Sequence, residues 1–470
     1  MFSKYVGRLQ GDWPYKAGRV PIFYGWVIAL ISTLGFLFSV PGQTMGMAVF
    51  ADSFIASFGL SRTELSLAYM LGTIASALFL TKAGRLYDEL GARIMLTASA
   101  LGLSCALLFI SSIDLVAEQV LQWVEVDLSI ITFPLILLGY FGVRFSGQGV
   151  MTSVSTNMLL LWFRRNRGRI LGFRGIFISL GFSLSPVLLA LLIDDFGWRD
   201  SLLLLALVVG PGFALLAFLA VRDRPEVCDL QVDGGRMQPK VEQLAATPPN
   251  SNTSSDSTFN TSINERSDLG LAQVKRNPVF WLYSSALSMH ALFGTAVTFH
   301  IVAIFAEAGR GRDEAFAYFI PQAVITVVVN LAASTLADYM RLKPFLLVML
   351  VSFVFGAVGL MNLQTDTGYW CLVVGFGAGS GLWGTLSNLV FIRQFGATHL
   401  GEITGLNTAF TVFGSAIGPL IFSVALDLTG SMFNAAQICA GLLVVLFVTA
   451  IFIRQPLDHA PSAKFRSDPR

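Results

Sequence analysis

Residues 172–197 read GFRGIFISLGFSLSPVLLALLIDDFG, and residues 405–430 repeat the same design as GLNTAFTVFGSAIGPLIFSVALDLTG. Among the residues that agree at a constant offset of 233 positions are three glycines, one proline and one aspartate. The loop Leu86-Tyr87-Asp88 has a weaker echo in Leu336-Ala337-Asp338. Many membrane carriers are built from duplicated multi-helix units that enclose a site between two halves. The repeat therefore predicts two related halves, and it favours a carrier over an enzyme or a channel.

The composition excludes a soluble globular protein. Hydrophobic residues make up 54% of the chain and charged residues only 13%, with a mean hydropathy of +0.68. Soluble domains are about one quarter charged. The four cysteines show no metal-ligand spacing and are interpreted as small hydrophobic residues. The first apolar run, residues 22–50, is too long for a signal peptide.

A membrane-spanning helix needs about 20 apolar residues, and the 470 residues supply twelve such runs. The predicted spans are residues 22–50, 63–83, 94–113, 129–161, 170–193, 201–221, 279–305, 314–337, 344–363, 368–392, 402–427 and 433–454. We therefore predict an all-α integral membrane protein with two six-helix bundles related by pseudo-two-fold symmetry. The bundles are expected at 1–221 and 278–470. The polar stretch 222–277 is expected to be a disordered cytoplasmic linker.

The basic residues predict the orientation of the chain. Of the 31 Lys and Arg residues, 25 lie on the side of the termini and the linker. Because cytoplasmic loops carry the excess of Lys and Arg, both termini are predicted to be cytoplasmic. The Asn-Thr-Ser sequons at Asn252 and Asn260 would then face the cytosol and carry no glycan. The short loops are typical of a cell-membrane protein of the bacterial inner membrane.

The loop between the second and third spans reads Gly84-Arg-Leu-Tyr-Asp88-Glu-Leu-Gly91-Ala-Arg93. Gly84 would allow a helix end to pack closely, Asp88 can cap an opposing helix N-terminus, and Gly91 permits a tight turn. The loop resembles the Gly-x-x-x-Asp-x-x-Gly-x-Arg signature of the major facilitator superfamily, in which it latches the inner gate. The resemblance implies a gating role for Gly84, Asp88, Gly91, Arg93 and the repeat-related Asp338.

Two further motifs resemble monocarboxylate-porter-like and oxalate–formate-exchanger-like members of that family. They are Tyr24-Gly-Trp-Val at the first span and the aromatic and basic run 162–172 before the fifth. The resemblance has departures. The eighth span offers only Tyr318, Gln322, Thr326 and Asn330 in place of the acidic and arginine residues of such porters, and the eleventh carries Asn407 in place of a basic residue. The substrate therefore does not follow from the family.

All 29 acidic residues fall in loops or at helix ends, so the two arginines inside spans, Arg144 and Arg174, lack an evident acidic partner. A charge at the membrane centre costs at least about 2.5–3.5 kcal/mol, and such residues usually mark a substrate path. The residues that share the helical face of Arg144 are Tyr140, Gln148, Met151 and Ser155. Arg144 is thus predicted to bind a carboxylate through parallel hydrogen bonds. The alternative is an arginine bonded to helix carbonyls or to the first span.

The remaining candidates are weaker. Arg174 aligns with Asn407 in the repeat and either contacts substrate or extends to the membrane surface. His290 is the titratable group near neutral pH inside the second half, where it carries a proton or packs. Other polar or aromatic residues that can line a cavity are Tyr69, Gln322 and Trp383.

These patterns predict a secondary carrier of a small organic anion, a monocarboxylate, that works by alternating access as a symporter, antiporter or facilitator. A carrier of neutral or amphipathic compounds is the alternative, and a non-transporting sensor is a weaker one. No Ser–His–Asp set, metal cluster or phosphate loop occurs in the spans, so we expect no enzyme activity, cofactor or metal. The expected partners are the substrate, protons and the lipid bilayer, without nucleic acid, and the expected state is a monomer.

Overall fold

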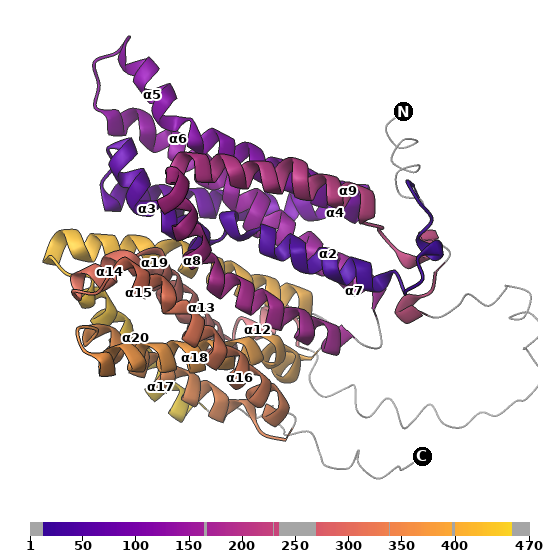
Figure 1. The fold of residues 1–470 in the computed structure, drawn as a ribbon. Coiled ribbons are helices and arrows are strands. Elements are labelled where there is room, and N and C mark those ends of the chain that lie inside the picture. The colour runs from indigo at the N-terminus through magenta and orange to yellow at the C-terminus, as the bar shows by residue number, and fades with distance from the viewer. Residues whose placement is uncertain are drawn as a thin grey trace, which may run out of the picture. The chain divides into compact units, whose positions relative to one another are not determined.

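The structure is a computed structural model that describes residues 13–163, 167–228, 230–234, 269–337, 339–396 and 400–453. Helices joined by short connections make up the described residues, with no β-strand among them (Figure 1). By its internal contacts the chain divides into two compact units, Met1–Ser254 (unit 1) and Ser255–Arg470 (unit 2).

Unit 1 contains five long helical stretches, several of them interrupted. Its elements are α2 (Gly25–Phe38), η2 (Val40–Gly42), α3 (Thr44–Phe58), α4 (Arg62–Ser111), α5 (Ile113–Leu121), α6 (Leu128–Val143), η3 (Arg144–Met151), α7 (Thr152–Trp162), α8 (Arg167–Leu207), η4 (Val208–Ala214), α9 (Leu215–Ala220) and the short turns η5 (Pro225–Cys228) and η6 (Val232–Gly234). Both η3 and η4 are π-helical segments inside longer helices.

Unit 2 repeats the long-helix pattern with fewer interruptions. Its elements are α12 (Leu271–Val274), α13 (Pro278–Phe299), α14 (Ile301–Glu307), α15 (Arg312–Ala317), α16 (Phe319–Ala337), α17 (Leu342–Met361), α18 (Asp366–Phe395), α19 (Leu400–Thr429) and α20 (Phe433–Phe452). The pair α13 and α14 bends by 71° at His300.

The helices of the described chain correspond to the twelve predicted spans. Among the residues that the structure describes, eight stretches are long and apolar enough to cross a membrane, or nine if α13 and α14 form one span. One of the eight, Ile170–Ala220, has 51 residues, which is enough for two crossings of a hydrocarbon core about 30 Å thick. The short apolar helices α2 and α3 continue one another through η2, and the glycine-rich α18 has 30 residues.

Glycines with positive φ separate consecutive spans that run on without a loop. Gly91 has a φ of 83° inside α4, and Gly197 has a φ of 78° inside α8. A residue with a Cβ adopts this conformation only with strain, so glycine suits both positions. The tight turn predicted at Gly91 is therefore present.

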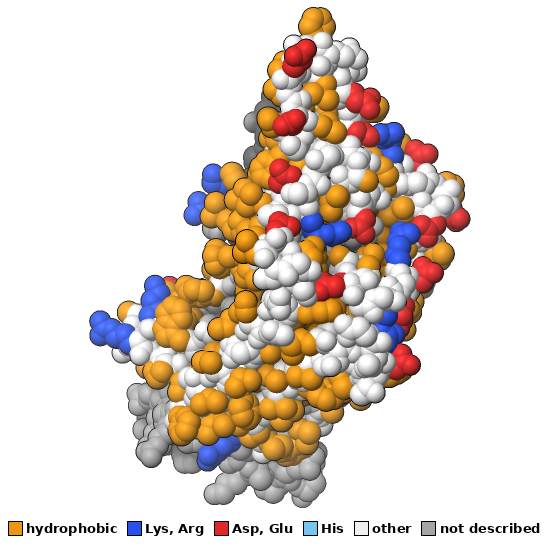
Figure 2. Space-filling model, turned by 90° about the vertical axis from the view of Figure 1, so that its left-hand side faces the viewer, with side chains coloured by type: hydrophobic (Ala, Val, Ile, Leu, Met, Phe, Trp, Pro, Cys, Tyr) orange, Lys and Arg blue, Asp and Glu red, His pale blue; other side chains and the backbone are white. Residues whose placement is uncertain are grey.

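The outer surface of the helices is apolar. Large hydrophobic side chains such as Leu78, Ile130, Leu188 and Val328 are more than half exposed. Figure 2 shows hydrophobic side chains over much of one face. Exposure on this scale is unusual for a soluble protein and suits helices that face lipid.

The repeated glycines allow helices to cross closely. A Cβ at Gly414 would lie 2.8 Å from the Ser288 carbonyl oxygen, and one at Gly418 would lie 2.2 Å from that of Leu292. In unit 1, a Cβ at Gly181 would similarly meet the Leu37 side chain at 2.3 Å. The duplicated motif thus brings α19 against α13 and α8 against α2, the mechanical role expected from its sequence.

Helices α16 and α18 pair through polar side chains at intervals of one turn. Thr326 Oγ1 donates to the Gly377 carbonyl at 3.1 Å, and Asn330 Nδ2 donates to the Gly381 carbonyl at 2.9 Å. One turn further along, the hydroxyls of Ser334 and Thr385 lie 3.1 Å apart. Two polar residues of the predicted eighth span therefore join helices.

The predicted linker 222–277 has described structure at both ends. Residues 222–234 contain η5 and η6 with buried Cys228, and residues 269–277 contain α12 with buried Val274. These buried residues pack on their own units, so the ends are not disordered. The middle, residues 235–268, lies outside the described residues, as do both sequons.

We expect Gly381→Ala to lower the thermal unfolding midpoint of the protein in detergent. The new Cβ would lie 2.7 Å from the Thr326 carbonyl oxygen, and overpacking of this kind costs about 1–3 kcal/mol. Gly441→Ala is the matched control, because no described atom lies within 4 Å of its Cβ and alanine favours the helix. Equal midpoints for the two variants would contradict the tight α16–α18 contact.

Candidate functional site

Arg144 begins the π-helical segment η3, and only 1% of it is exposed. Its Nε donates to Thr73 Oγ1 at 3.2 Å, and its Nη1 donates to the Gly42 carbonyl at 3.3 Å and to Thr44 Oγ1 at 3.4 Å. The guanidinium also lies over the ring of Tyr69, 5.0 Å from its centroid. Within the described chain no carboxylate pairs with Arg144, and its Nη2 makes no hydrogen bond.

These contacts place Arg144 at the break in the first span. The segment η2 separates α2 from α3, which begins at Thr44 without a side-chain cap from Gln43. The first N–H groups of a helix lack intrahelical acceptors and carry partial positive charge. A buried guanidinium and a helix N-terminus thus concentrate positive charge at one place in unit 1, an arrangement suited to an anion. Neither Thr44 nor Thr73 was singled out from the sequence, which offers no local signal for them.

Two tyrosines complete the surroundings of Arg144. The rings of Tyr69 and Tyr140 pack edge to face with centroids 5.5 Å apart, and Tyr69 Oη lies 2.7 Å from Thr44 Oγ1. Tyr140 Oη is buried without a hydrogen-bond partner in the described chain. The structure thus brings together three of the predicted residues, namely Arg144, Tyr69 and Tyr140.

The rest of the predicted polar face of the fourth span lies against the first span. The backbone of Gln148 approaches η2 so closely that a Cβ at Gly42 would lie 3.1 Å from its nitrogen, while its side chain is half-buried. Ser155 accepts a hydrogen bond from Ser32 Oγ at its carbonyl, at 2.5 Å. This face therefore meets η2 and α2, as the alternative interpretation of Arg144 expects.

Arg174 is also buried among neutral groups. It donates from Nη1 to Thr156 Oγ1 at 3.3 Å and from Nη2 to the Ser32 carbonyl at 3.4 Å, and it lies over the ring of Phe36. Only 6% of it is exposed, so it does not extend to the surface as one sequence interpretation expected. The repeat-related Asn407 is 9% exposed, and its Oδ1 is buried without a partner in the described chain.

In unit 2, His290 and Trp383 come together. The His290 ring stacks on Phe353 at 4.8 Å between centroids and lies 4.9 Å from Trp383, whose Nε1 donates to the Leu287 carbonyl at 3.3 Å. No acidic group pairs with His290 in the described chain. Gln322 on α16 is half-buried, and its carbonyl accepts a hydrogen bond from Thr326 Oγ1 at 2.9 Å.

The loop predicted to form the gate differs in part from its expected geometry. No described atom lies within 4 Å of a Cβ at Gly84, so the close packing expected there is absent. Asp88 is exposed and has no hydrogen bond or ion pair to the described residues, so it caps none of the described helix ends. Asp338 lies outside the described residues.

Asp223 caps the start of the third span. Its Oδ1 accepts the Arg93 N–H at 2.9 Å, and a Cβ at Gly91 would lie 2.7 Å from its carboxyl oxygens. Glycine at this turn therefore makes room for the carboxylate as well as for the positive φ. Asp223 stands between Arg222 and Arg224 in the predicted linker, and no pattern in this basic stretch singled it out as a capping residue.

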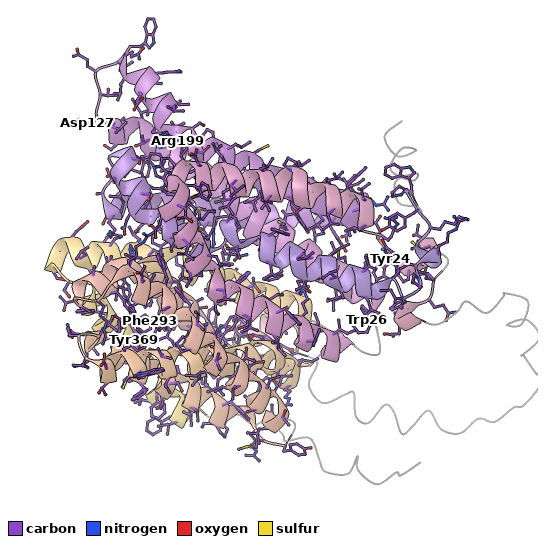
Figure 3. All side chains as sticks on the ribbon, viewed as in Figure 1. Tyr24, Trp26, Asp127, Arg199, Phe293 and Tyr369 are labelled. Carbon is purple, nitrogen blue, oxygen red and sulfur yellow. The ribbon has the colours of Figure 1, made fainter. Side chains whose placement is uncertain are left out.

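Four side chains satisfy the carbonyl groups at the end of α9, and we call this set the α9 cap. Arg222 Nη1 donates to the Leu219 carbonyl at 2.8 Å, Tyr24 Oη to that of Ala220 at 2.6 Å, Arg93 Nε to that of Val221 at 2.7 Å and Trp162 Nε1 to that of Arg222 at 3.1 Å. The donors come from different parts of unit 1, and Tyr24 marks this end in Figure 3. Arg93 is thus a buried structural residue here.

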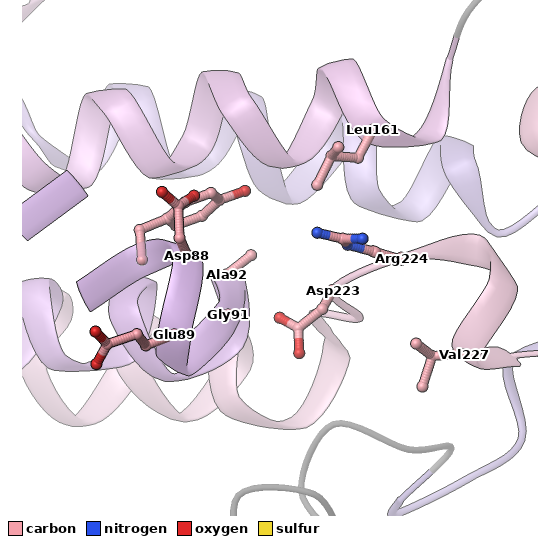
Figure 4. A pocket seen from close by; sticks show the side chains of 9 residues that line it. Asp88, Glu89, Gly91, Ala92, Leu161, Asp223, Arg224 and Val227 are labelled. Carbon is pink, nitrogen blue, oxygen red and sulfur yellow. The ribbon is translucent and has the colours of Figure 1, made fainter. Parts of the chain in front are cut away.

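A pocket of about 420 Å³ opens beside the α9 cap (Figure 4). Asp88, Glu89, Asp223 and Arg224 supply its charged lining, and Gly91 and Leu161 complete part of its wall. The pocket lies between the loop 84–93 and the end of the sixth span, so movement of either segment would change the shape of the pocket.

We expect Asp223→Asn to retain the cap and to alter the pH dependence of stability. Burial raises the pKa of Asp223, although the Arg93 N–H opposes this shift. The folded state therefore holds its proton more tightly than the unfolded state, whose pKa is about 3.9. The wild type should gain stability relative to Asp223→Asn as the pH falls through the raised pKa towards the unfolded-state value, and lose this gain as the pH rises back through the raised pKa. Parallel curves of unfolding midpoint against pH would contradict the prediction.

The described residues hold no group of three or more His, Cys, Asp or Glu side chains placed to bind a metal ion. The arrangement around Arg144 offers positive charge and hydrogen-bond donors but no nucleophile paired with a base. It is suited to binding.

Comparison with known proteins agrees with this assessment. Residues 32–419 match the family model described as Major Facilitator Superfamily. Among solved structures, the chain is similar to a bacterial homologue of the human lysosomal transporter Spinster in its inward-facing, occupied conformation (TM-score 0.65, 13% identity, 94% of this chain and 100% of that chain covered). It is similarly related to a D-xylose–proton symporter (TM-score 0.64, 16% identity, 92% and 98% covered). No curated protein matches the sequence. The chain belongs to the major facilitator superfamily, and it is a secondary transporter that works by alternating access rather than an enzyme.

Proposed function

We propose that this transporter carries a small organic anion, specifically a monocarboxylate, and that Arg144 binds the carboxylate. The observation that carries the proposal is a buried guanidinium beside the N-terminus of α3, with no acidic partner in the described chain. An uncompensated charge inside a membrane protein is costly, and an anionic substrate would neutralise it.

The present hydrogen bonds of Arg144 can be exchanged for stronger ones. Its three acceptors are neutral oxygens at 3.2–3.4 Å, at the long end of the hydrogen-bond range. A carboxylate accepts bonds from a guanidinium that are shorter and about twice as strong. Bound substrate would therefore draw Nη1 away from Gly42 and Thr44 and free η3 from the break in the first span.

This exchange would couple binding to movement. Tyr140 Oη, which is buried without a partner, would orient the substrate together with Tyr69 and Gln148. We propose the same role, contact with the substrate, for the remaining predicted residues. These are Arg174, Gln322, His290, Trp383 and Asn407. At the gate we propose that the loop carrying Gly84, Asp88, Gly91 and Arg93, with its counterpart at Asp338, opens and closes the cytoplasmic side.

We also propose a monomer in the cell membrane, with both termini and the segment 222–277 in the cytoplasm. The excess of Lys and Arg on that side supports the orientation. We propose that the substrate crosses the membrane either alone or together with a proton.

The alternative is a carrier of neutral or amphipathic compounds. In that case Arg144 is structural and holds the first span at its break, a role that its three neutral hydrogen bonds suit. One of the similar structures is named for D-xylose, which is uncharged. A non-transporting sensor is a third and weaker alternative.

We expect Arg144→Gln to abolish saturable uptake of labelled monocarboxylates by cells that express the protein. Hydrogen bonds to a charged group contribute about 1.5–3 kcal/mol, so affinity should fall roughly 10- to 150-fold. Arg19→Gln is the control, because it removes one exposed cation from the same unit. If Arg144→Gln takes up the carboxylates as well as the wild type, or the wild type takes up none, the neutral-substrate alternative is favoured.

We expect His290→Phe to leave the pH dependence of uptake unchanged. The imidazole stacks with Phe353 and Trp383 and has no acidic partner in the described chain, so a phenyl ring should replace it in packing. Uptake at outside pH values of about 5.5 and 7.5 brackets the ordinary histidine pKa near 6.5. A wild-type rise in uptake at acid pH that the variant loses would instead assign proton coupling to His290.

A further inference from the structure

The helix α5 projects from the end of unit 1 that lies far from Tyr24 (Figures 1 and 3). It begins at Ile113, two residues after the third span ends at Ser111, and turns away from the direction of that span (Figure 1). Only Ile113 and Ala117 of α5 are buried, and they face the rest of the unit. The helix lies beside α6, but most of its side chains are exposed in the described chain.

The apolar face of α5 is wider than the part that is buried. Val116 and Val120, one turn apart, are 39% and 37% exposed, and Trp123 just beyond the helix is 86% exposed. Asp114 and Glu118 share the opposite face. An exposed apolar stripe beside a charged one is the pattern of a helix that lies at a membrane surface.

The stripe continues a surface that already faces lipid. Leu108 near the end of the third span and Ile130 near the start of the fourth are 45% and 62% exposed on either side of α5. Because α5 connects these two spans, its depth is fixed at the membrane–water interface. Tryptophan is enriched at that depth, since its ring is apolar and its N–H polar.

Arg199 holds α5 at its base. It donates from Nε to the Ser111 carbonyl at 3.2 Å and pairs through Nη2 with Asp114 (Arg199 is labelled in Figure 3). One side chain thus binds the last residue of the third span and the first turn of α5. This contact sets the direction in which the helix leaves the bundle.

We propose that α5 and Trp123 form an anchor that rests in the headgroup region of the bilayer, with the Val116, Val120 and Trp123 side chains in contact with lipid. The segment 113–127 carries Asp114, Glu118, Glu125 and Asp127 and no basic residue. It is therefore suited to a surface rich in zwitterionic lipid, and anionic lipid should weaken the contact.

The test places a fluorophore on each face of the anchor in the full-length protein, reconstituted in zwitterionic phosphatidylcholine vesicles. The native cysteines Cys105, Cys228, Cys371 and Cys439 are first replaced by serine. Trp123→Cys then carries an environment-sensitive label, and Glu118→Cys, exposed on the polar side of the helix, carries the same label as the matched control.

We expect lipids with a nitroxide near the headgroup to quench the label at 123 several-fold more than the label at 118, and aqueous iodide to show the reverse. Replacing part of the phosphatidylcholine with phosphatidylglycerol should reduce the lipid quenching at 123. Equal lipid quenching at both positions would overturn the proposal. So would a label at 123 that neither quencher reaches, which would indicate a protein partner or a second copy.

Discussion

The unpaired carbonyl groups at the end of the sixth span require hydrogen-bond donors, and the arrangement of unit 1 depends on how they are supplied. The last carbonyls of a helix have no intrahelical partner, and leaving them buried and unbonded is costly. Arg222, Tyr24, Arg93 and Trp162 supply the donors from the first, third, fourth and sixth spans or their flanks. At the start of the third span an N–H group requires an acceptor, and Asp223 supplies it. One cluster of side chains thus supplies hydrogen-bond partners for the carbonyl groups at the end of α9 and for the N–H group at the start of the third span.

The same demand for hydrogen bonds decides which polar residues remain for a substrate. Thr326 and Asn330 are occupied by carbonyl groups of α18, where glycines bring the two backbones close. Arg144 is different, because its acceptors are neutral and its positive charge is unmatched in the described chain. Arg174 shares this feature, and the nearby N-terminus of α3 and the unpartnered Tyr140 hydroxyl distinguish Arg144 as the candidate for binding an anion.

Several features were predictable because they depend on local pattern. The apolar runs determine the helices, the duplicated glycines allow close crossings, and Gly91 provides the turn in the loop 84–93. The pairing of Arg144 with the broken first span was only an alternative, since no pattern in residues 22–50 marks η2 as a break. Asp88 was predicted to cap an opposing helix N-terminus, but it caps none of the described helix ends, and Asp223 caps the third span at Arg93 from 130 positions further along the chain.

By itself the sequence determined that this protein is a duplicated helical membrane transporter, because hydropathy and glycine spacing act over a few turns of helix. The tertiary structure alone decided which donors meet which acceptors. Arg144 lies at the N-terminus of α3, Asp223 at Gly91, and Val116 and Val120 on the uncovered side of α5. Each of these placements depends on the helices that pack beside the residue, and long-range packing of this kind leaves no periodic signal in the chain.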